Sequence, residues 1–437
     1  MRRFLWLLFF TIFIQGSVHG QQLLSDMMDT TSHVNKGFLS LYEKYNWLRF
    51  SGYLQPQFQY AESKGAHSFN GGDFPANADN RFTLRRGRFR MDYLRLDNDN
   101  YPAAHLVFQF DGSEKGFAIR DFWGRVFENK WHLFSLTAGM FARPFGYEVN
   151  LGSGDRESPE RGRMSQLLMR AERDLGAMLT LEPRKRSNKW SWLRADVAVM
   201  NGQGLSGTVD YDSHKDVVAR VYSKAQHLNR HGWTLSGGVS VYEGGIVSQS
   251  PMLYRSEGHG NEARMQLDSA ADNIGALAPR RYYGTDVQFK IPNKKGFTEL
   301  RAEYIRGQQT GTATSSESPG VYPMNGLLPG DLYSRSFDGA YFYFLQHLGS
   351  EHHQLVLKYD WYDPNTRVKG KEVSATHGFN GADVKFQTIG LGYIWYVNSN
   401  VKTVLFYEHV LNEKTTVASY TEDQKDDVFT CRLQFRF

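Results

Sequence analysis

Apolar and polar residues alternate along most of the chain after residue 46, with a period of two. The final segment shows this most clearly. Its apolar and polar positions are Phe429, Cys431, Leu433, Phe435 and Phe437 against Thr430, Arg432, Gln434 and Arg436. Successive side chains of a β-strand point to opposite faces of a sheet. The pattern therefore predicts strands that have one apolar face and one water-facing face.

Sixteen segments fit this description. They are 47–61, 81–97, 102–112, 117–127, 131–141, 173–183, 190–201, 215–226, 231–243, 279–291, 297–310, 337–347, 352–363, 383–396, 400–412 and 425–437. The gaps between them are alternately long and short, apart from the short gap 113–116. The long gaps are 62–80, 142–172, 202–214, 244–278, 311–336, 364–382 and 413–424.

Alternating gap lengths indicate a barrel whose two rims differ. Outer-membrane barrels have short turns on the periplasmic rim and long loops outside, and an even strand number returns the chain to the periplasm. Closure removes the sheet edges that a bilayer would not tolerate. We therefore expect an all-β fold, a transmembrane antiparallel up-and-down β-barrel of about sixteen strands over residues 47–437, in the outer membrane of a Gram-negative-type bacterium. The alternative is a soluble secreted β-protein, although a β-sandwich has no reason to sort its loops by rim.

The start of the chain differs from the rest. A short basic stretch is followed by an apolar run over residues 4–14 and by small residues before Gln21. This order is typical of a signal peptide, 1–20, and the run is shorter than the ~20 apolar residues of a spanning helix. A buried N-terminal helix is the alternative. Residues 21–46 have apolar residues at helical spacing, which predicts a short helical or flexible segment.

The charge balance and the motif search change the picture little. Residues 1–20 hold two of the 51 basic residues, so 49 basic residues then face 46 acidic ones. This excess argues neither for nor against a nucleic-acid partner, and with the strand pattern we expect none. Cys431 is the only cysteine, so an intrachain disulfide is excluded. The sequence has no nucleophile elbow, metal-ligand spacing or phosphate-binding glycine loop, so we expect no enzyme and no cofactor.

Two arginine-rich segments are the candidates for selecting solutes. The gap 142–172 is long enough to fold into the lumen as a constriction, and its candidate anion-binding residues are Arg143, Arg161, Arg163 and Arg170. In the second predicted strand, Arg86, Arg88 and Arg90 share the lumen parity. Guanidinium groups present forked donors to oxyanions, so arginines in a pore favour anions.

Other interpretations of these arginines stay open. The long gap is also consistent with a solvated surface loop that has internal ion pairs. The strand arginines can pair with acidic neighbours and stiffen the wall. Arg120 and Arg125 differ in parity, so a regular strand cannot turn both of them to the lumen.

The order of several motifs resembles the phosphate-selective porin O/P family. The motifs are the Arg-rich segment 85–90, Arg120-Asp121, Arg143-Pro144-Phe145-Gly146 and Glu172-Arg173-Asp174. The resemblance covers about 47–437 and is densest over 81–180. The alternation that ends in Phe437 is similar to the signature that outer-membrane barrels present to their assembly machinery.

The resemblance implies a sixteen-stranded barrel, commonly trimeric, that passes small anions passively through a pore lined by an arginine ladder and a lysine cluster. Arg86, Arg88 and Arg90 match the ladder, whereas Lys64, Lys115, Lys215 and Lys358 are scattered. The leading hypothesis is passive diffusion of small anionic or polar solutes, phosphate or polyphosphate among them, by a homotrimer embedded in outer-membrane lipids. The alternatives are a non-selective general porin and a plugged barrel whose loops 244–278 and 311–336 bind a partner.

Overall fold

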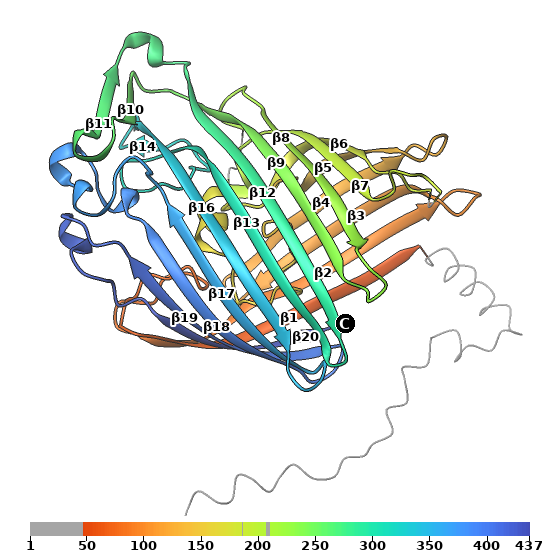
Figure 1. Ribbon diagram of the computed structural model, residues 1–437. Coiled ribbons are helices and arrows are strands. Elements are labelled where there is room, and N and C mark those ends of the chain that lie inside the picture. The colour runs from red at the N-terminus through yellow and green to blue at the C-terminus, as the bar shows by residue number, and fades with distance from the viewer. Residues whose placement is uncertain (1–46, 186, 207–209) are drawn as a thin grey trace, which may run out of the picture. The chain divides into compact units, whose positions relative to one another are not determined.

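Sixteen long strands form the wall of a barrel in the computed structural model, which describes residues 47–185, 187–206 and 210–437 (Figure 1). The predicted signal peptide, 1–20, and the predicted helical segment, 21–46, lie outside the described residues. Within the described ranges, no helix is long and apolar enough to cross a membrane.

The barrel strands follow one another in chain order. They are β1 (Leu48–Ala61), β2 (Asn80–Leu96), β3 (Pro102–Ser113), β4 (Gly116–Phe127), β5 (Phe134–Ala142), β6 (Arg173–Leu181), β7 (Leu193–Met200), β8 (Asp216–His227), β9 (Thr234–Val247), β12 (Leu277–Asn293), β13 (Gly296–Gly311), β16 (Leu332–His347), β17 (His353–Asp363), β18 (Phe386–Tyr396), β19 (Val401–Asn412) and β20 (Val428–Arg436). The prediction of sixteen strands is confirmed, and each predicted segment overlaps one of them.

The first and last strands close the barrel. β1 pairs antiparallel with β20, for example Phe58 opposite Cys431, and it also pairs with β2. Gly52 and Phe437 exchange two backbone hydrogen bonds of 3.2 and 3.1 Å. The fold is thus a closed antiparallel β-barrel without a free edge between its ends.

Short elements lie within the long loops. The gap 244–278 contains a hairpin of β10 (Met252–Glu257) and β11 (Arg264–Ser269), and the gap 311–336 contains β14 (Met324–Asn325) and β15 (Leu328–Pro329). The one described α-helix is α2 (Arg163–Leu168). Short 3₁₀ turns are η2 (Gly204–Ser206), η3 (Gly260–Glu262), η4 (Ala271–Asn273), η5 (Gly370–Glu372), η6 (Ala375–His377), η7 (Gly381–Asp383) and η8 (Ala418–Tyr420).

Burial follows the alternation of the sequence. In β20, Arg432 and Gln434 are each 3% exposed, whereas Phe435 is 43% exposed. Polar side chains therefore line the interior and apolar side chains form an outer belt, which is the reverse of a soluble protein and fits a wall in contact with lipid. Lumenal carboxylates at the predicted parity, among them Asp216 and Asp286, are likewise buried.

Candidate functional site

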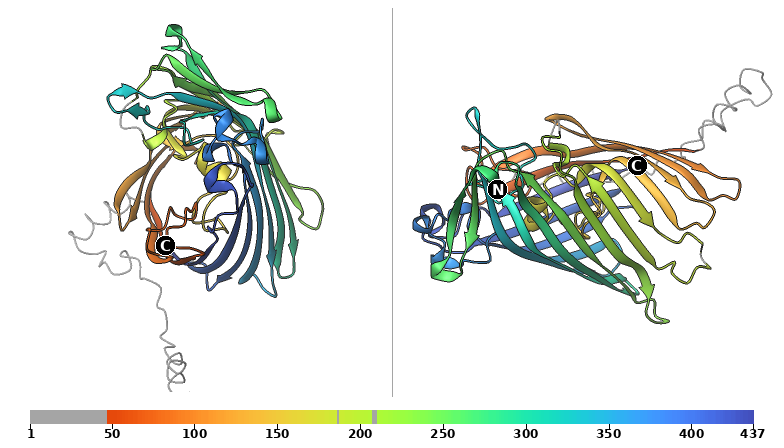
Figure 2. Two further views of the ribbon diagram at one scale, coloured as in Figure 1. Left: turned by 90° about the vertical axis from the view of Figure 1, so that its left-hand side faces the viewer. Right: turned by 90° about the horizontal axis from the view of Figure 1, so that it is seen from above.

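The loop between β5 and β6, residues 143–172, lies inside the barrel. Looking into the barrel from the side of the long loops, Figure 2 shows its yellow segment within the opening. Its contacts reach strands on all sides of the lumen. Gln55 of β1, Lys402 of β19 and Gln434 of β20 donate hydrogen bonds to backbone oxygens of Ser153, Arg156 and Gly154. The backbone N–H of Gly146 donates to Ser240 of β9. The hydroxyls of Tyr53 of β1 and Tyr343 of β16 share hydrogen bonds with those of Ser153 and Ser158. The loop is thereby fixed across the lumen.

Apolar packing holds one part of this loop. Phe145 and Met164 are fully or almost fully buried and belong to a cluster with lumen-facing aromatic residues, including Tyr242, Tyr282 and Phe337. The ring of Phe145 meets those of Tyr242 and Tyr282 edge to face, with centroids 6.3 and 6.0 Å apart. The apolar side chains at both ends of the loop therefore anchor it to β9, β12 and β16.

Eight arginines gather around four carboxylates on another side of the loop. This arginine cluster consists of Arg85, Arg86, Arg88, Arg120, Arg156, Arg161, Arg173 and Arg432, ion-paired with Asp111, Asp121, Glu160 and Glu172. Eight positive charges against four negative ones leave an excess of four. A lumen wall with such an excess attracts anions.

Glu160 is the centre of the cluster. Its carboxylate oxygens lie 2.8 Å from Arg85, 2.6 Å from Arg86, 3.0 Å from Arg432 and 3.9 Å from Arg156. Burial acts to raise the pKa of Glu160, but the surrounding guanidinium groups outweigh it and hold the pKa well below its usual range. The carboxylate is therefore charged throughout the neutral range and ties the loop to β2 and β20.

Arg156 is the least neutralised member. Its Nε and Nη1 atoms are buried and have no hydrogen-bond partner in the part of the chain that the structure describes. Burial, and the positive charges of Arg161 and Arg86, lower the pKa of Arg156 to about 10. The ammonium group of Lys402 adds a further cation nearby, since it donates a 3.1 Å hydrogen bond to the backbone oxygen of Arg156. A buried donor group that lacks an acceptor is suited to receive an anion.

A second cluster on β8, β12, β13 and the loop has the opposite composition. This carboxylate cluster consists of Glu148, Glu157, Asp286, Glu299 and Glu303 with Arg220 and Arg301. Five negative charges against two positive ones leave an excess of three. The carboxylate of Glu303 accepts hydrogen bonds from the backbone N–H groups of Tyr147 and Glu148, at 3.2 and 3.0 Å. The loop is therefore held between a cationic and an anionic wall.

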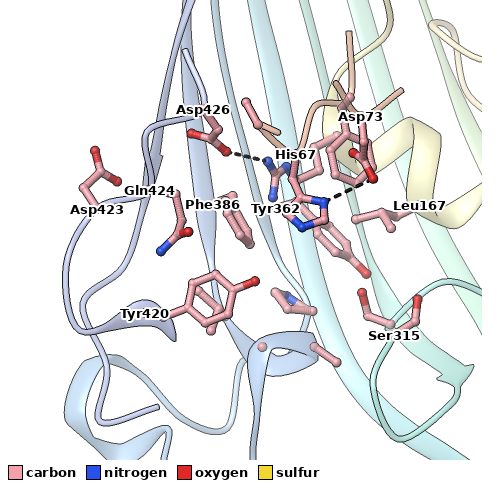
Figure 3. A pocket seen from close by; sticks show the side chains of 18 of the residues that line it. His67, Asp73, Leu167, Ser315, Tyr362, Phe386, Tyr420, Asp423, Gln424 and Asp426 are labelled. Atoms are coloured by element: carbon pink, nitrogen blue, oxygen red, sulfur yellow. Dashed lines mark ion pairs between the residues drawn. The ribbon is translucent and has the colours of Figure 1, made fainter. Parts of the chain in front are cut away.

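A cavity of about 620 Å³ opens among the long loops (Figure 3). The Arg163 guanidinium carbon lies over the rings of Phe386 and Phe69, at 3.5 and 4.4 Å, and one nitrogen lies 3.7 Å from Asp426. Burial raises the pKa of Asp426 to about 7, against the opposing effect of Arg163. We call this cavity the vestibule. A smaller cavity shares Phe69, Arg163 and Asp426 with it and continues to Arg161, so the vestibule leads toward the arginine cluster.

The structure brings together only part of the predicted set. Arg86, Arg88 and Arg161 belong to the arginine cluster. Arg90 faces the lumen but pairs with Asp92 at 2.7 Å, apart from the cluster, and Arg163 lines the vestibule.

Two predicted residues lie elsewhere. The buried guanidinium of Arg143 donates to Asp174 and to backbone oxygens of Gly202 and Ala171, so it fixes the start of the loop. The side chain of Arg170 is 68% exposed and pairs with Glu317. Neither joins the arginine cluster.

Backbone irregularity explains why the prediction omitted Arg120. The register of β3 and β4 shifts at Gln109, so that Arg120 is an extra residue between Ile119 and Asp121. This bulge allows both Arg120 and Arg125 to be largely buried on the inside, which a regular strand would not permit. Arg85 also contacts Glu160, although adjacent residues of a regular strand point to opposite faces and Arg86 already points to the lumen. Arg432 shows the simple alternation and was detectable from its parity.

The described ranges hold no group of three or more His, Cys, Asp or Glu side chains placed to bind a metal ion. What the site offers is fixed charge around the lumen. Such an arrangement can select solutes by size and charge.

Comparisons with known proteins agree with this geometry. Residues 68–437 match the family model of phosphate-selective porins O and P. The structure is similar to the outer membrane channel DcaP of Acinetobacter baumannii, with 12% identity, a TM-score of 0.52 and coverage of 89% of this chain and 97% of DcaP. It is also similar to OmpF of Salmonella typhi in complex with daunomycin, with 12% identity, a TM-score of 0.50 and coverage of 89% and 97%.

A comparison with curated proteins gave no match. The family match covers most of the chain, and the fold is that of outer-membrane channels. The chain is therefore an outer-membrane channel of a Gram-negative bacterium for passive diffusion of solutes, and it belongs to the family of phosphate-selective porins O and P.

Proposed function

We propose that the channel passes small anions in preference to cations, inorganic phosphate among them, along the arginine cluster. The observation that carries the proposal is the excess of four positive charges beside the loop. Rings of arginine select for anions and phosphate in pores. Arg86, Arg156 and Arg432 contribute most, because they are buried around one carboxylate.

The predicted residues outside the cluster take other roles in this proposal. Arg163 meets the solute first, in the vestibule, and Arg88, Arg90 and Arg161 extend the charged wall. Arg143 and Arg170 act on the loop and its surroundings rather than on the solute. No cofactor is needed, and we expect no catalytic activity.

The family resemblance supports two proposals about assembly. The functional unit is a homotrimer in outer-membrane lipids. Phe437 directly follows β20, is 67% exposed, and is recognised by the barrel assembly machinery. Cross-linking in native membranes, before and after removal of Phe437, tests both.

A second candidate is a general porin without ion preference. The carboxylate cluster favours it, because an excess of three negative charges opposes the arginine cluster across the loop. Most cluster arginines also share a carboxylate, which reduces their field. The two candidates differ in ion selectivity and agree in fold.

Reconstitution in a planar bilayer distinguishes them. The purified protein would be placed in a potassium chloride gradient, and the reversal potential measured before and after adding phosphate. A shift toward the chloride potential, with current reduced by phosphate, is the expected result. Open channels with a reversal potential near zero, unaffected by phosphate, would replace the proposal by the general porin.

A further inference from the structure

A cavity of about 400 Å³ lies at the loop end of β12, β13 and β16. The residues that line it from the barrel include Arg281, Gln308 and Ser334. Arg281 points outward, because its neighbours Arg280 and Tyr282 are buried in the lumen while its own side chain is 52% exposed. The cavity therefore opens on the outside of the barrel wall, apart from the solute path.

The cavity is rich in guanidinium groups. Arg255 of β10 and Arg367 of the loop after β17 line it together with Arg281, and Glu257 is the one carboxylate among its lining residues. β10 reaches this place because it pairs in parallel with the start of β16, Arg255 opposite Ser334 (Figure 1). Nε of Arg367 is buried without an acceptor among the described residues.

The charges of this cavity are only partly balanced by neighbours. Arg281 lies 3.2 Å from Glu243, and Arg255 lies 3.7 Å from Asp268. The nitrogen Nη1 of Arg367 donates to the backbone oxygen of Gly258 at 3.2 Å. The cavity is also lined by Ser256, Ser334 and Ser336. Serine hydroxyls and three guanidinium groups together suit a phosphate group, since guanidinium binds phosphate through two parallel hydrogen bonds.

An apolar groove of about 800 Å³ lies on the outer face of the same strands, nearer the short turns. Val287 of β12, Leu300 of β13 and Phe342 of β16 line it, and Ala302 is a small residue among them. Arg281 and Val287 are six residues apart on β12, which corresponds to ~20 Å along the strand. This separation along the strand is similar in size to the half-thickness of the hydrocarbon core, which is roughly 15 Å.

We propose that this face binds a phosphorylated lipid of the outer leaflet, with its phosphate between Arg255, Arg281 and Arg367 and an acyl chain in the groove at Ala302. A phosphate above and a hydrocarbon chain below is the chemistry that a cationic pocket and an apolar groove on one membrane-facing surface recognise together. Free phosphate would use only the pocket, and a second copy of the chain would use only the groove.

Native mass spectrometry of the full chain in detergent tests the proposal. The probes are dimyristoyl phosphatidic acid, dimyristoyl phosphatidylcholine and inorganic phosphate. Phosphatidic acid should bind about tenfold more tightly than phosphatidylcholine, and R281Q/R367Q should lose about that factor. Ala302→Phe should weaken retention of phosphatidic acid by filling the groove.

The matched control is Arg306→Gln, which removes an exposed arginine from the same face of β13 outside the cavity. It should bind phosphatidic acid like the unchanged protein. Bilayer conductance, which does not depend on this face, verifies that each variant folds. Equal binding of phosphatidic acid by R281Q/R367Q would overturn the proposal. So would full competition by inorganic phosphate without an effect of Ala302→Phe, or a change of oligomer mass on Ala302→Phe without a change in lipid binding.

Discussion

The arginine cluster and the carboxylate cluster hold the same loop with opposite charge. Around Glu160, four arginines share one carboxylate. Around Arg301, the guanidinium serves both Glu157 and Glu299, while Glu303 has backbone N–H groups as partners. Both arrangements fix the loop, but they leave charges of opposite sign facing the path. The comparison shows that arginines and carboxylates can anchor a loop at either ratio, whereas their ratio sets the sign of the charge beside the path.

Removing the centre of the arginine cluster should have the largest effect. Glu160→Gln would leave buried guanidinium groups without their shared carboxylate, which costs roughly 3–5 kcal/mol of unfolding free energy. Urea unfolding of the protein in liposomes, followed by tryptophan fluorescence, measures this. The control is Asp155→Asn, because the Asp155–Arg436 pair is exposed and contributes about 0–1 kcal/mol. Equal stability of both variants would show that the cluster does not hold the loop.

Changing one charge of the cationic wall should reduce ion preference without loosening the loop. Arg156→Gln removes a charge that has only a 3.9 Å contact with Glu160. A unit charge ~8 Å from an ion contributes about 0.5 kcal/mol in water, and salt screening reduces this to roughly 0.2 kcal/mol. Because the lost charge acts with opposite sign on chloride and on potassium, the chloride-over-potassium permeability ratio should fall about twofold. Reversal potentials measure the ratio, and Arg306→Gln on the outer face is the control. A ratio that stays the same in Arg156→Gln contradicts the assignment.

The converse change on the anionic wall should sharpen anion preference. Glu299→Gln removes a carboxylate, while Arg301 keeps its two hydrogen bonds to Glu157 at 2.7 and 2.9 Å. The chloride-over-potassium ratio should rise by about twofold or less, since Glu299 acts at a similar distance. A ratio that falls or stays the same would mean that the carboxylate of Glu299 does not act on the permeating ions.

The smallest expected effect is a pH dependence at the vestibule. The pKa of Asp426 is raised to about 7, first by burial, so its carboxylate gains a proton as the pH falls from 8 to 6. Protonation removes a negative charge beside Arg163, and anion preference should therefore rise by less than about twofold at the screened pore mouth. Asp426→Asn should show the low-pH ratio at both pH values. A persistent pH dependence in this variant would assign it to another group.

The barrel frame was predictable because it depends on local alternation. In β20 and β12 every second side chain contacts the lumen, and this period is visible in the sequence itself. The hairpin β10–β11 escaped prediction, since its strands have six residues each and one partner is β16, far along the chain. The arginines Arg86, Arg88 and Arg90 are ion-paired, as the interpretation of stiffening wall residues expects. Their selection of anions stays a prediction.

The site was harder to predict because its contacts are distant in the sequence. Glu160 meets Arg86 and Arg432, which are 74 and 272 positions away. Whether Arg120 faces the lumen depends on a bulge opposite Gln109, and no residue pattern in 116–127 predicts this bulge. The arginines could thus be counted in the sequence, whereas their partners and the resulting net charge required the structure.

The position of Glu160 also has a consequence for the order in which the molecule is built. Its partners Arg86 and Arg432 belong to β2 and β20, which come from opposite ends of the chain and are brought close by β1. The complete set of partners does not exist until the last strand has joined the first. The ion pairs around Glu160 are therefore completed as a late step of biogenesis, and this buried carboxylate stabilises only those barrels that have already closed.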